Sequence, residues 1–386
     1  KIMMIKFFKK IPLFFLTTLN ITKFYFLNIF EKRNIVFFYF PVKAYSENII
    51  EIKSEIEKSN KFKSYLVYNS NSSNQIKKNN DSFFLDFDFV RYIPFNKIFL
   101  KNIKVFITSY VNYVFPPNST NIYICHDIAD APMVNRNIEK KIFLSLNKYD
   151  YIYLSSEFVV KYYKRKFFNY LGSNFKPKLI NTGYLKLDNV IKKLKKYRLK
   201  KTKILVAPTS SLMMNKYNMT NCLFETIDYL LKLGEKVIYR PHPIDITKKG
   251  NFKLVDLIKR KFKKNSNFEL DLSSSYLRSY SEAKILITDF SGTAYTFSYS
   301  TLKPVIFISK NEKNLLKSDN SKLTYFKDRK KIGEICSNAK NLKKLIFKIK
   351  KNNFFYSKKI DILRRKRIKH FNNALNKTSE LIISLN

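Results

Sequence analysis

The 386-residue sequence has only three cysteines, Cys125, Cys222 and Cys336, which lie far apart and form no CxxC pair. A structural zinc site or a disulfide framework needs paired or closely spaced cysteines, so the sequence indicates neither. It also lacks an Asp-x-Asp cluster and a histidine spacing typical of zinc ligands. We therefore expect no essential metal ion and no cofactor, and a reducing compartment fits best.

Long apolar runs are scarce as well. Residues 11–19 follow two lysines, as in a signal peptide, but Pro12 interrupts the run and no small-residue cleavage site follows it. The run is shorter than the ~20 residues that a helix needs to span a bilayer. The longer uncharged stretch at residues 105–126 contains a loop sequence at residues 115–121. We therefore expect a soluble or peripheral protein.

Acidic residues are few, and the positive charge is extreme. The chain has 74 Lys and Arg against 29 Asp and Glu, a net charge of +45. A basic surface attracts nucleic acid, nucleotide substrates or acidic lipid. The charge is spread along the chain and no nucleic-acid-binding motif occurs, so we expect no specific nucleic-acid partner. The alternative is that the lysines reflect the codon bias of an AT-rich genome.

Apolar runs that predict strands alternate with helical patterns, first over residues 34–168 and again from residue 204. A lysine-rich stretch at residues 188–203 separates the two series and indicates a domain boundary. We therefore predict an α/β fold with two Rossmann-like domains that face a cleft. The expected ranges are 1–196 for the N-terminal domain, 197–350 for the C-terminal domain and 351–386 for a basic C-terminal helix.

The expected strands lie at residues 34–40, 65–68, 105–108, 122–124, 151–154, 204–208, 236–239, 285–288 and 304–307. The expected helices lie at residues 1–30, 48–58, 137–147, 157–168, 188–203, 220–233, 254–263, 275–283, 340–350 and 360–385, with one more beginning near residue 293.

Two of the three histidines follow predicted strands. His126 comes after residues 122–124, and His242 comes after residues 236–239 in the segment Arg240-Pro241-His242-Pro243. Ligand groups in an open α/β sheet lie at the carboxyl ends of its strands, and histidine transfers protons near neutral pH. We therefore take both as candidates for proton transfer at a phosphate diester. The alternative is that both are packed structural residues.

A third motif is Asp289-Phe290-Ser291-Gly292-Thr293, where a strand ends and a helix begins. Backbone N–H groups at the start of a helix bind anions. Ser291 and Thr293 add hydroxyl donors, and Gly292 allows the backbone to approach a phosphate closely. The alternative is an ordinary N-cap, with Asp289 as a strand-end cap.

These motifs, in this order, resemble the CDP-glycerol glycerophosphotransferase family, which builds teichoic-acid-type polymers. The resemblance covers residues 105–307 and includes the segments Thr182-Gly183-Tyr184-Leu185-Lys186-Leu187-Asp188, Ala207-Pro208-Thr209 and Lys303-Pro304-Val305. It implies a two-domain fold of the glycosyltransferase B type. It also implies transfer of an alditol phosphate from a CDP-activated donor to an acceptor hydroxyl, with CMP leaving.

The resemblance assigns roles by position. His126 is the general base on the acceptor hydroxyl, and Arg240 and His242 hold the donor pyrophosphate. A phosphate is cradled by the third motif, with the residues Asp289, Ser291, Gly292 and Thr293. Elementary chemistry agrees, because a cation and a helix N-terminus stabilise the charge that develops on the leaving CMP.

Two aspartates near His126 are candidates to orient it. Asp127 and Asp130 follow it closely in sequence. The alternative for both is a loop or capping role, which is common for aspartates between elements.

The sequence departs from the family pattern in three places. Asp127 follows His126 where glycine is usual, Gly292 replaces a second serine, and residues 295–297 replace an acidic residue. The donor is therefore open between CDP-glycerol, CDP-ribitol and a nucleotide sugar. The alternative function is a nucleotide-sugar glycosyltransferase for capsule or surface glycan, and a third is a non-enzymatic anion-binding protein.

The family resemblance also implies a lipid-linked or glycan acceptor. We therefore expect a cytoplasmic protein that is peripheral on the inner face of the cell membrane. Aromatic residues and lysines alternate over residues 11–33, and this segment is the expected contact with an anionic membrane surface.

Overall fold

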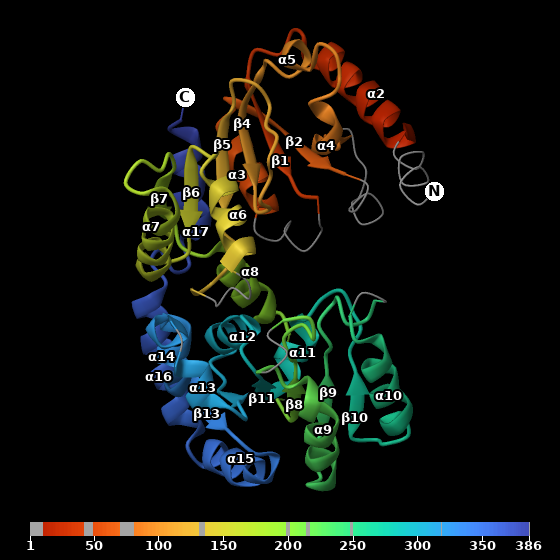
Figure 1. The fold of residues 1–386 in the computed structure, drawn as a ribbon, viewed down its shortest axis with the longest axis vertical. Helices are drawn as coiled ribbons and strands as arrows, with labels where there is room; N and C mark the ends of the chain where they lie inside the picture. Colours follow the sequence, from red (N-terminus) through yellow and green to blue (C-terminus); the bar gives the residue numbers. More distant parts are fainter. Residues whose placement is uncertain are drawn as a thin grey trace. The chain divides into compact units, whose positions relative to one another are not determined.

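The computed structural model describes residues 11–41, 49–69, 81–130, 136–197, 201–213, 217–247, 250–317 and 319–385. The chain forms two compact units. One consists of Lys1–His126, Arg136–Lys186 and His370–Asn386, and the other of Asp127–Asn135 and Leu187–Lys369. Each unit is built on one parallel sheet with helices (Figure 1), which confirms the predicted α/β fold. The units divide at residue 186, where we expected 196, and the chain returns to the first unit at His370.

The first sheet has the order β3-β2-β1-β4-β5-β6-β7, and neighbouring strands are parallel. Its strands are β1 (Asn34–Tyr39), β2 (Phe62–Tyr68), β3 (Ser82–Phe84), β4 (Ile103–Thr108), β5 (Thr120–Ile124), β6 (Tyr151–Leu154) and β7 (Lys178–Asn181). The helices of this unit are α2 (Ile11–Asn28), α3 (Ile50–Glu57), α4 (Phe87–Val90), α5 (Asn96–Phe99), α6 (Arg136–Leu146), α7 (Glu157–Leu171) and α17 (Ala374–Ile383).

The core of the first unit lies on both faces of β1. Successive side chains of a strand point to opposite faces. Val36 and Phe38 accordingly pack with α3 and α17, whereas Ile35 and Phe37 pack with α2. The C-terminal helix α17 therefore completes the core of the N-terminal unit.

The second sheet has the order β10-β9-β8-β11-β12-β13, again with parallel neighbours. Its strands are β8 (Lys203–Val206), β9 (Val237–Tyr239), β10 (Phe268–Leu270), β11 (Ala283–Thr288), β12 (Val305–Ile308) and β13 (Gly333–Cys336). Its longer helices are α9 (Leu223–Lys232), α10 (Phe252–Phe262), α12 (Thr293–Thr301), α14 (Thr324–Ile332), α15 (Leu342–Lys351) and α16 (Asn353–Arg367). Shorter ones are η3 (Thr220–Cys222), α11 (Leu277–Glu282), α13 (Glu312–Lys317), η4 (Asp319–Lys322) and η5 (Ala339–Asn341), and α8 (Leu185–Leu194) lies at the junction of the units.

All nine predicted strands are present, and four further strands are not predicted by the sequence. These four, β3, β7, β10 and β13, are the edges of the two sheets. The helix predicted at residues 1–30 is present as α2, and residues 1–10 lie outside the described ranges. The single helix predicted at residues 360–385 is wrong, because His370 and Asn372 have φ of 52° and 64° and separate α16 from α17.

Within the ranges that the structure describes, no helix is long and apolar enough to cross a bilayer. The same ranges contain no group of three His, Cys, Asp or Glu side chains placed to hold a metal ion.

Asp130 has the capping role that its position suggested. Its two carboxylate oxygens accept the backbone N–H groups of Thr324 and Tyr325 at the start of α14, both at 2.9 Å. Burial raises the pKa of Asp130, and these hydrogen bonds offset part of the increase. The carboxylate thereby satisfies two N–H groups that have no partner inside the helix.

We expect Asp130→Ala to lower the free energy of unfolding by about 1–2 kcal/mol, because a lost helix cap costs about this much. Urea unfolding measures the change. The control is Asp256→Ala, which removes a more exposed pair with Arg260 on α10 and should cost less than about 1 kcal/mol. Equal losses in the two variants would contradict the capping role.

Candidate functional site

The strand order of the second sheet reverses at β8. The chain continues from β8 to β9 and β10 on one side, and then returns to place β11 on the other side. Open α/β sheets bind ligands at the carboxyl ends of the strands near such a reversal. The segments that follow β10, β9, β8 and β11 are neighbours at this edge, and they form the candidate site.

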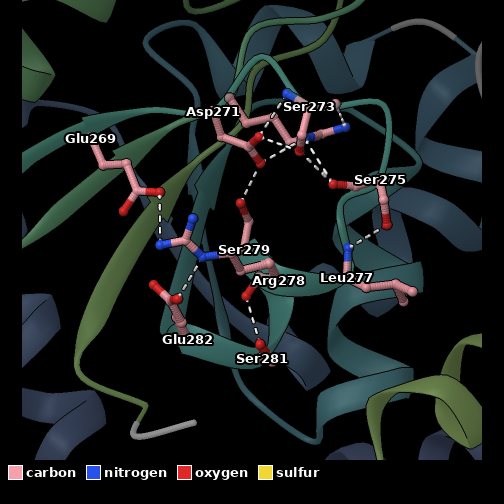
Figure 2. Close-up of polar contacts among 10 residues, drawn as sticks. Glu269, Asp271, Ser273, Ser275, Leu277, Arg278, Ser279, Ser281 and Glu282 are labelled. Atoms are coloured by element: carbon pink, nitrogen blue, oxygen red, sulfur yellow. Dashed lines mark hydrogen bonds and ion pairs between the residues drawn. The ribbon is translucent and has the colours of Figure 1, made fainter. Parts of the chain in front are cut away.

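Arg240 follows β9 and holds the segment that follows β10. Its Nη1 lies 2.6 Å from Oδ2 of Asp271, and its Nη2 donates to the carbonyl of Ser273 at 2.9 Å. Figure 2 shows Ser273 and Ser279 directed at the Asp271 carboxylate. Burial alone would raise the pKa of Asp271, but hydrogen bonds from the two serines and the guanidinium lower it overall. The ion pair therefore fixes residues 271–275 beside β9.

Asp245 joins the segments that follow β9 and β8. Its carboxylate accepts the backbone N–H of Ser211 at 3.0 Å and also the Ser211 hydroxyl. It further accepts the N–H of Asn251 at 3.2 Å. The side chain is buried, so these bonds lie in a low dielectric where they are strong.

Asp289 joins the segments that follow β11 and β8. Its two oxygens accept the backbone N–H groups of Thr209 and Met219, each at 3.0 Å. Burial raises the pKa of Asp289, and the two N–H groups offset part of the increase. This arrangement fits the alternative of a strand-end cap, because both oxygens are occupied by the protein itself.

The segment Ser291-Gly292-Thr293 leads into α12. The Ser291 hydroxyl accepts the N–H of Thr293 at 3.3 Å, and the Ser291 carbonyl accepts the Tyr325 hydroxyl at 3.0 Å. A side chain at Gly292 would meet nothing within 4 Å, so the space beside its backbone is open. A helix start with open space beside it suits a phosphate group.

His242 is held in one tautomer. Its Nδ1 lies 3.3 Å from the backbone nitrogen of Ile244 and accepts that N–H. The neutral ring therefore carries its proton on Nε2 and acts as a hydrogen-bond donor there. Burial lowers the pKa of His242, and the charge of Asp245 offsets part of the decrease.

His126 follows β5 in the first unit. Its Nδ1 lies 3.2 Å from the hydroxyl of Tyr123, and its backbone carbonyl accepts the hydroxyl of Tyr184 at 2.7 Å. Tyr123 and Tyr184 are both buried, which restricts the ring and the backbone of His126. Cys125, its neighbour, is buried with Sγ 3.4 Å from the hydroxyl of Tyr163.

The structure gathers most of the predicted site residues at one edge of the second sheet. These residues are Arg240, His242, Asp289, Ser291, Gly292 and Thr293. His126 belongs to the first unit. Three residues that the sequence did not single out support them, namely Tyr123, Asp245 and Asp271. Asp271 could be found from the sequence only as the residue that follows β10. The sequence does not predict that strand.

Comparison with known proteins decides the family. The model of the family described as CDP-Glycerol:Poly(glycerophosphate) glycerophosphotransferase matches residues 20–382. The chain belongs to this family. The resemblance found in the sequence motifs is thereby confirmed over nearly the whole chain.

The chain is also similar to individual relatives. It is 34% identical over 142 residues to the minor teichoic acid biosynthesis protein GgaB of Bacillus subtilis (strain 168), a match that covers 35% of this chain and 14% of that protein. The structure of the wall teichoic acid polymerase TagF matches with a TM-score of 0.61 at 16% identity, covering 99% of this chain and 95% of that chain. The UDP-GlcNAc 2-epimerase from Methanocaldococcus jannaschii matches with a TM-score of 0.56 at 12% identity, covering 91% and 99%. These structures confirm a fold of the glycosyltransferase B type.

The lowered pKa of His242 makes stability depend on pH. In the unfolded chain this residue binds a proton below pH ~6.5. In the folded protein it binds the proton only at a lower pH. The free energy of unfolding should therefore fall as pH decreases below about 6.5. In His242→Gln, urea unfolding measured from pH 7.5 to pH 5 should show a smaller fall than in the wild type. Identical pH slopes would contradict this assignment.

Proposed function

We propose that this chain transfers glycerol phosphate, or a similar polyol phosphate, from a CDP-activated donor to an acceptor hydroxyl and releases CMP. The proposed setting is the synthesis of a cell-envelope polymer. The observation that carries the proposal is the family match over residues 20–382, together with the histidine and serine motifs at the strand ends.

In this proposal His126 is the general base. A base needs an unprotonated Nε2, so its proton sits on Nδ1 and is donated to the Tyr123 hydroxyl, 3.2 Å away. Tyr123 then orients the ring as an acidic residue does in other base dyads. The acceptor hydroxyl loses its proton to Nε2 as its oxygen attacks the donor phosphorus.

The second unit binds the donor. His242 donates from Nε2 to a phosphate oxygen, and the start of α12 receives the other phosphate with Ser291, Gly292 and Thr293. Asp289 and Asp245 hold these segments from inside the protein. Arg240 contributes by holding residues 271–275, and direct contact of Arg240 with the donor phosphate is the alternative.

The proposal extends to the membrane, where a lipid-linked or glycan acceptor would be met. Helix α2 buries Ile21 and Phe24, yet Phe15 and Leu19 on its other side are 65% and 67% exposed. Phe30, just after the helix, is 90% exposed. We place this apolar face in the interfacial layer of the inner leaflet, where such surfaces are buried.

His126→Ala should lower turnover by about 10²–10⁴-fold, which is the usual effect of removing a general base. CMP affinity should be unchanged, because the donor is bound by the other unit. The assays are CMP release from CDP-glycerol and CMP protection against thermal unfolding. The matched control is His370→Asn, since asparagine tolerates the φ of 52° at that position.

Turnover of His126→Ala within about threefold of the wild type would remove the general-base role. UDP-sugars and CMP-sugars are run beside CDP-glycerol and CDP-ribitol. Turnover of a sugar nucleotide alone would replace the proposed activity with glycosyl transfer.

Arg240→Ala should weaken donor binding, because it removes the ion pair that holds residues 271–275. The expected loss is about 10-fold to 150-fold, which corresponds to the 1.5–3 kcal/mol of a charge-assisted hydrogen bond. Asp271→Asn decides how Arg240 acts. If Arg240 works by holding residues 271–275, both variants lose similar affinity in calorimetry. If only Arg240→Ala loses affinity, the guanidinium contacts the donor directly and the support role is wrong.

A further inference from the structure

Helices α9 and α15 of the second unit lie side by side (Figure 1) and line an open groove of about 550 Å³. The rim of the groove carries four lysines, Lys340, Lys343, Lys344 and Lys350. Apolar side chains also line it, among them Leu233 just after α9 and Phe347 on α15. The donor-binding edge proposed above involves neither helix, so this groove is distinct from that edge.

The spacing on α15 places lysine and phenylalanine on one face. Lys343 and Lys344 lie four and three residues before Phe347, and residues with this spacing are neighbours on a helix. Leu342, Ile346 and Ile349 are the buried residues of α15, and Ile346 also lines the groove. Phe347 is 69% exposed although the helix has a core face for its other apolar residues.

Exposed phenylalanines also follow α15 in the sequence. Phe354 and Phe355, at the start of α16, are 82% and 58% exposed. Large apolar side chains exposed near each other mark an interaction surface.

The charge of the segment is of one sign. Residues 339–360 contain eight lysines and no acidic residue, a net charge of +8. Glu235 lines the groove, and its carboxylate is bound by Lys284 and by Lys350 at 2.7 Å. Burial alone would raise the pKa of Glu235, but these two lysines lower it overall. The groove therefore presents a positive potential that complements an anionic partner.

The exposed phenylalanines indicate which kind of anionic partner fits the groove. A soluble polyphosphate or polynucleotide backbone would pair with the lysines but would leave these rings in water. The interface of an anionic bilayer accommodates both groups, because lysines meet the phosphates while aromatic rings sit between headgroups and acyl chains. Each lysine near such a surface strengthens binding by about fivefold.

We propose that the α9–α15 groove and the adjoining start of α16 form a docking surface for an anionic phospholipid bilayer. The surface belongs to the second unit, whereas α2 belongs to the first. The proposal depends neither on the contact of α2 with a membrane nor on the transfer reaction.

The test uses the absence of tryptophan from the sequence. Phe347→Trp introduces a single tryptophan at the groove of the full chain. With vesicles of phosphatidylglycerol and phosphatidylcholine, its emission should shift to shorter wavelength and be quenched by brominated acyl chains. Phosphatidylcholine alone should cause neither change, and high salt should weaken both.

Control variants localise the effect. Phe252→Trp on α10, where the phenylalanine is 50% exposed, should show no shift and no quenching. Phe30→Trp reports separately on the first unit.

In the Phe347→Trp background, Lys343→Glu with Lys344→Glu should weaken binding to the anionic vesicles by at least about 30-fold. Lys259→Glu with Lys263→Glu, exposed lysines in the last turn of α10 and at its C-cap, should leave it within about threefold.

Several outcomes would overturn the proposal. An unchanged emission spectrum of the Phe347→Trp variant on anionic vesicles would do so even if the Phe30→Trp variant responds, because the chain would then bind through the first unit. Equal responses to neutral and anionic vesicles would also do so. A response to inorganic polyphosphate without quenching by brominated lipid would assign the groove to a soluble polyanion instead.

Discussion

The candidate site depends on three aspartates that connect four neighbouring segments at one edge of the second sheet. Asp271 holds Arg240, Asp245 holds Ser211, and Asp289 holds Thr209 and Met219. Each carboxylate accepts hydrogen bonds from a segment that belongs to a neighbouring strand. A parallel sheet brings such segments together but leaves their backbone N–H groups without ladder partners, and a carboxylate is a compact way to satisfy two of them at once.

The two histidines named by the sequence motifs have different hydrogen-bond partners. The Ile244 N–H fixes the proton of His242 on Nε2, and burial keeps the ring neutral, so His242 suits donation to an oxyanion. Nδ1 of His126 lies 3.2 Å from the Tyr123 hydroxyl, whose oxygen can accept a proton from that nitrogen. In the proposed reaction, His126 of the first unit would remove the proton and the second unit would stabilise the developing charge.

Much of the fold and part of the site could be predicted from the sequence. Central strands such as β1 and β11 are buried on both faces, so they appear as continuous apolar runs, whereas the edge strand β10 is only half-buried and its sequence Phe268–Leu270 includes a glutamate. The motif residues His242 and Ser291 were found because they follow such central strands. Asp271 was missed because it follows an edge strand, and Asp245 because its partner Ser211 is 34 residues away, a pairing set only by tertiary structure.

The departure from the family pattern at residues 295–297 has a structural consequence. Tyr295, the first of these residues, is buried and donates its hydroxyl to the carbonyl of Tyr325. Tyr325 in turn donates to the carbonyl of Ser291, and Asp130 fixes Tyr325 by accepting its N–H at 2.9 Å. A chain of hydrogen bonds thus supports the Ser291 segment from within the second unit without placing a carboxylate at residue 295. Because a carboxylate near a bound phosphate would repel it, a neutral tyrosine at this position keeps the support while leaving the potential around the start of α12 more favourable to an anion.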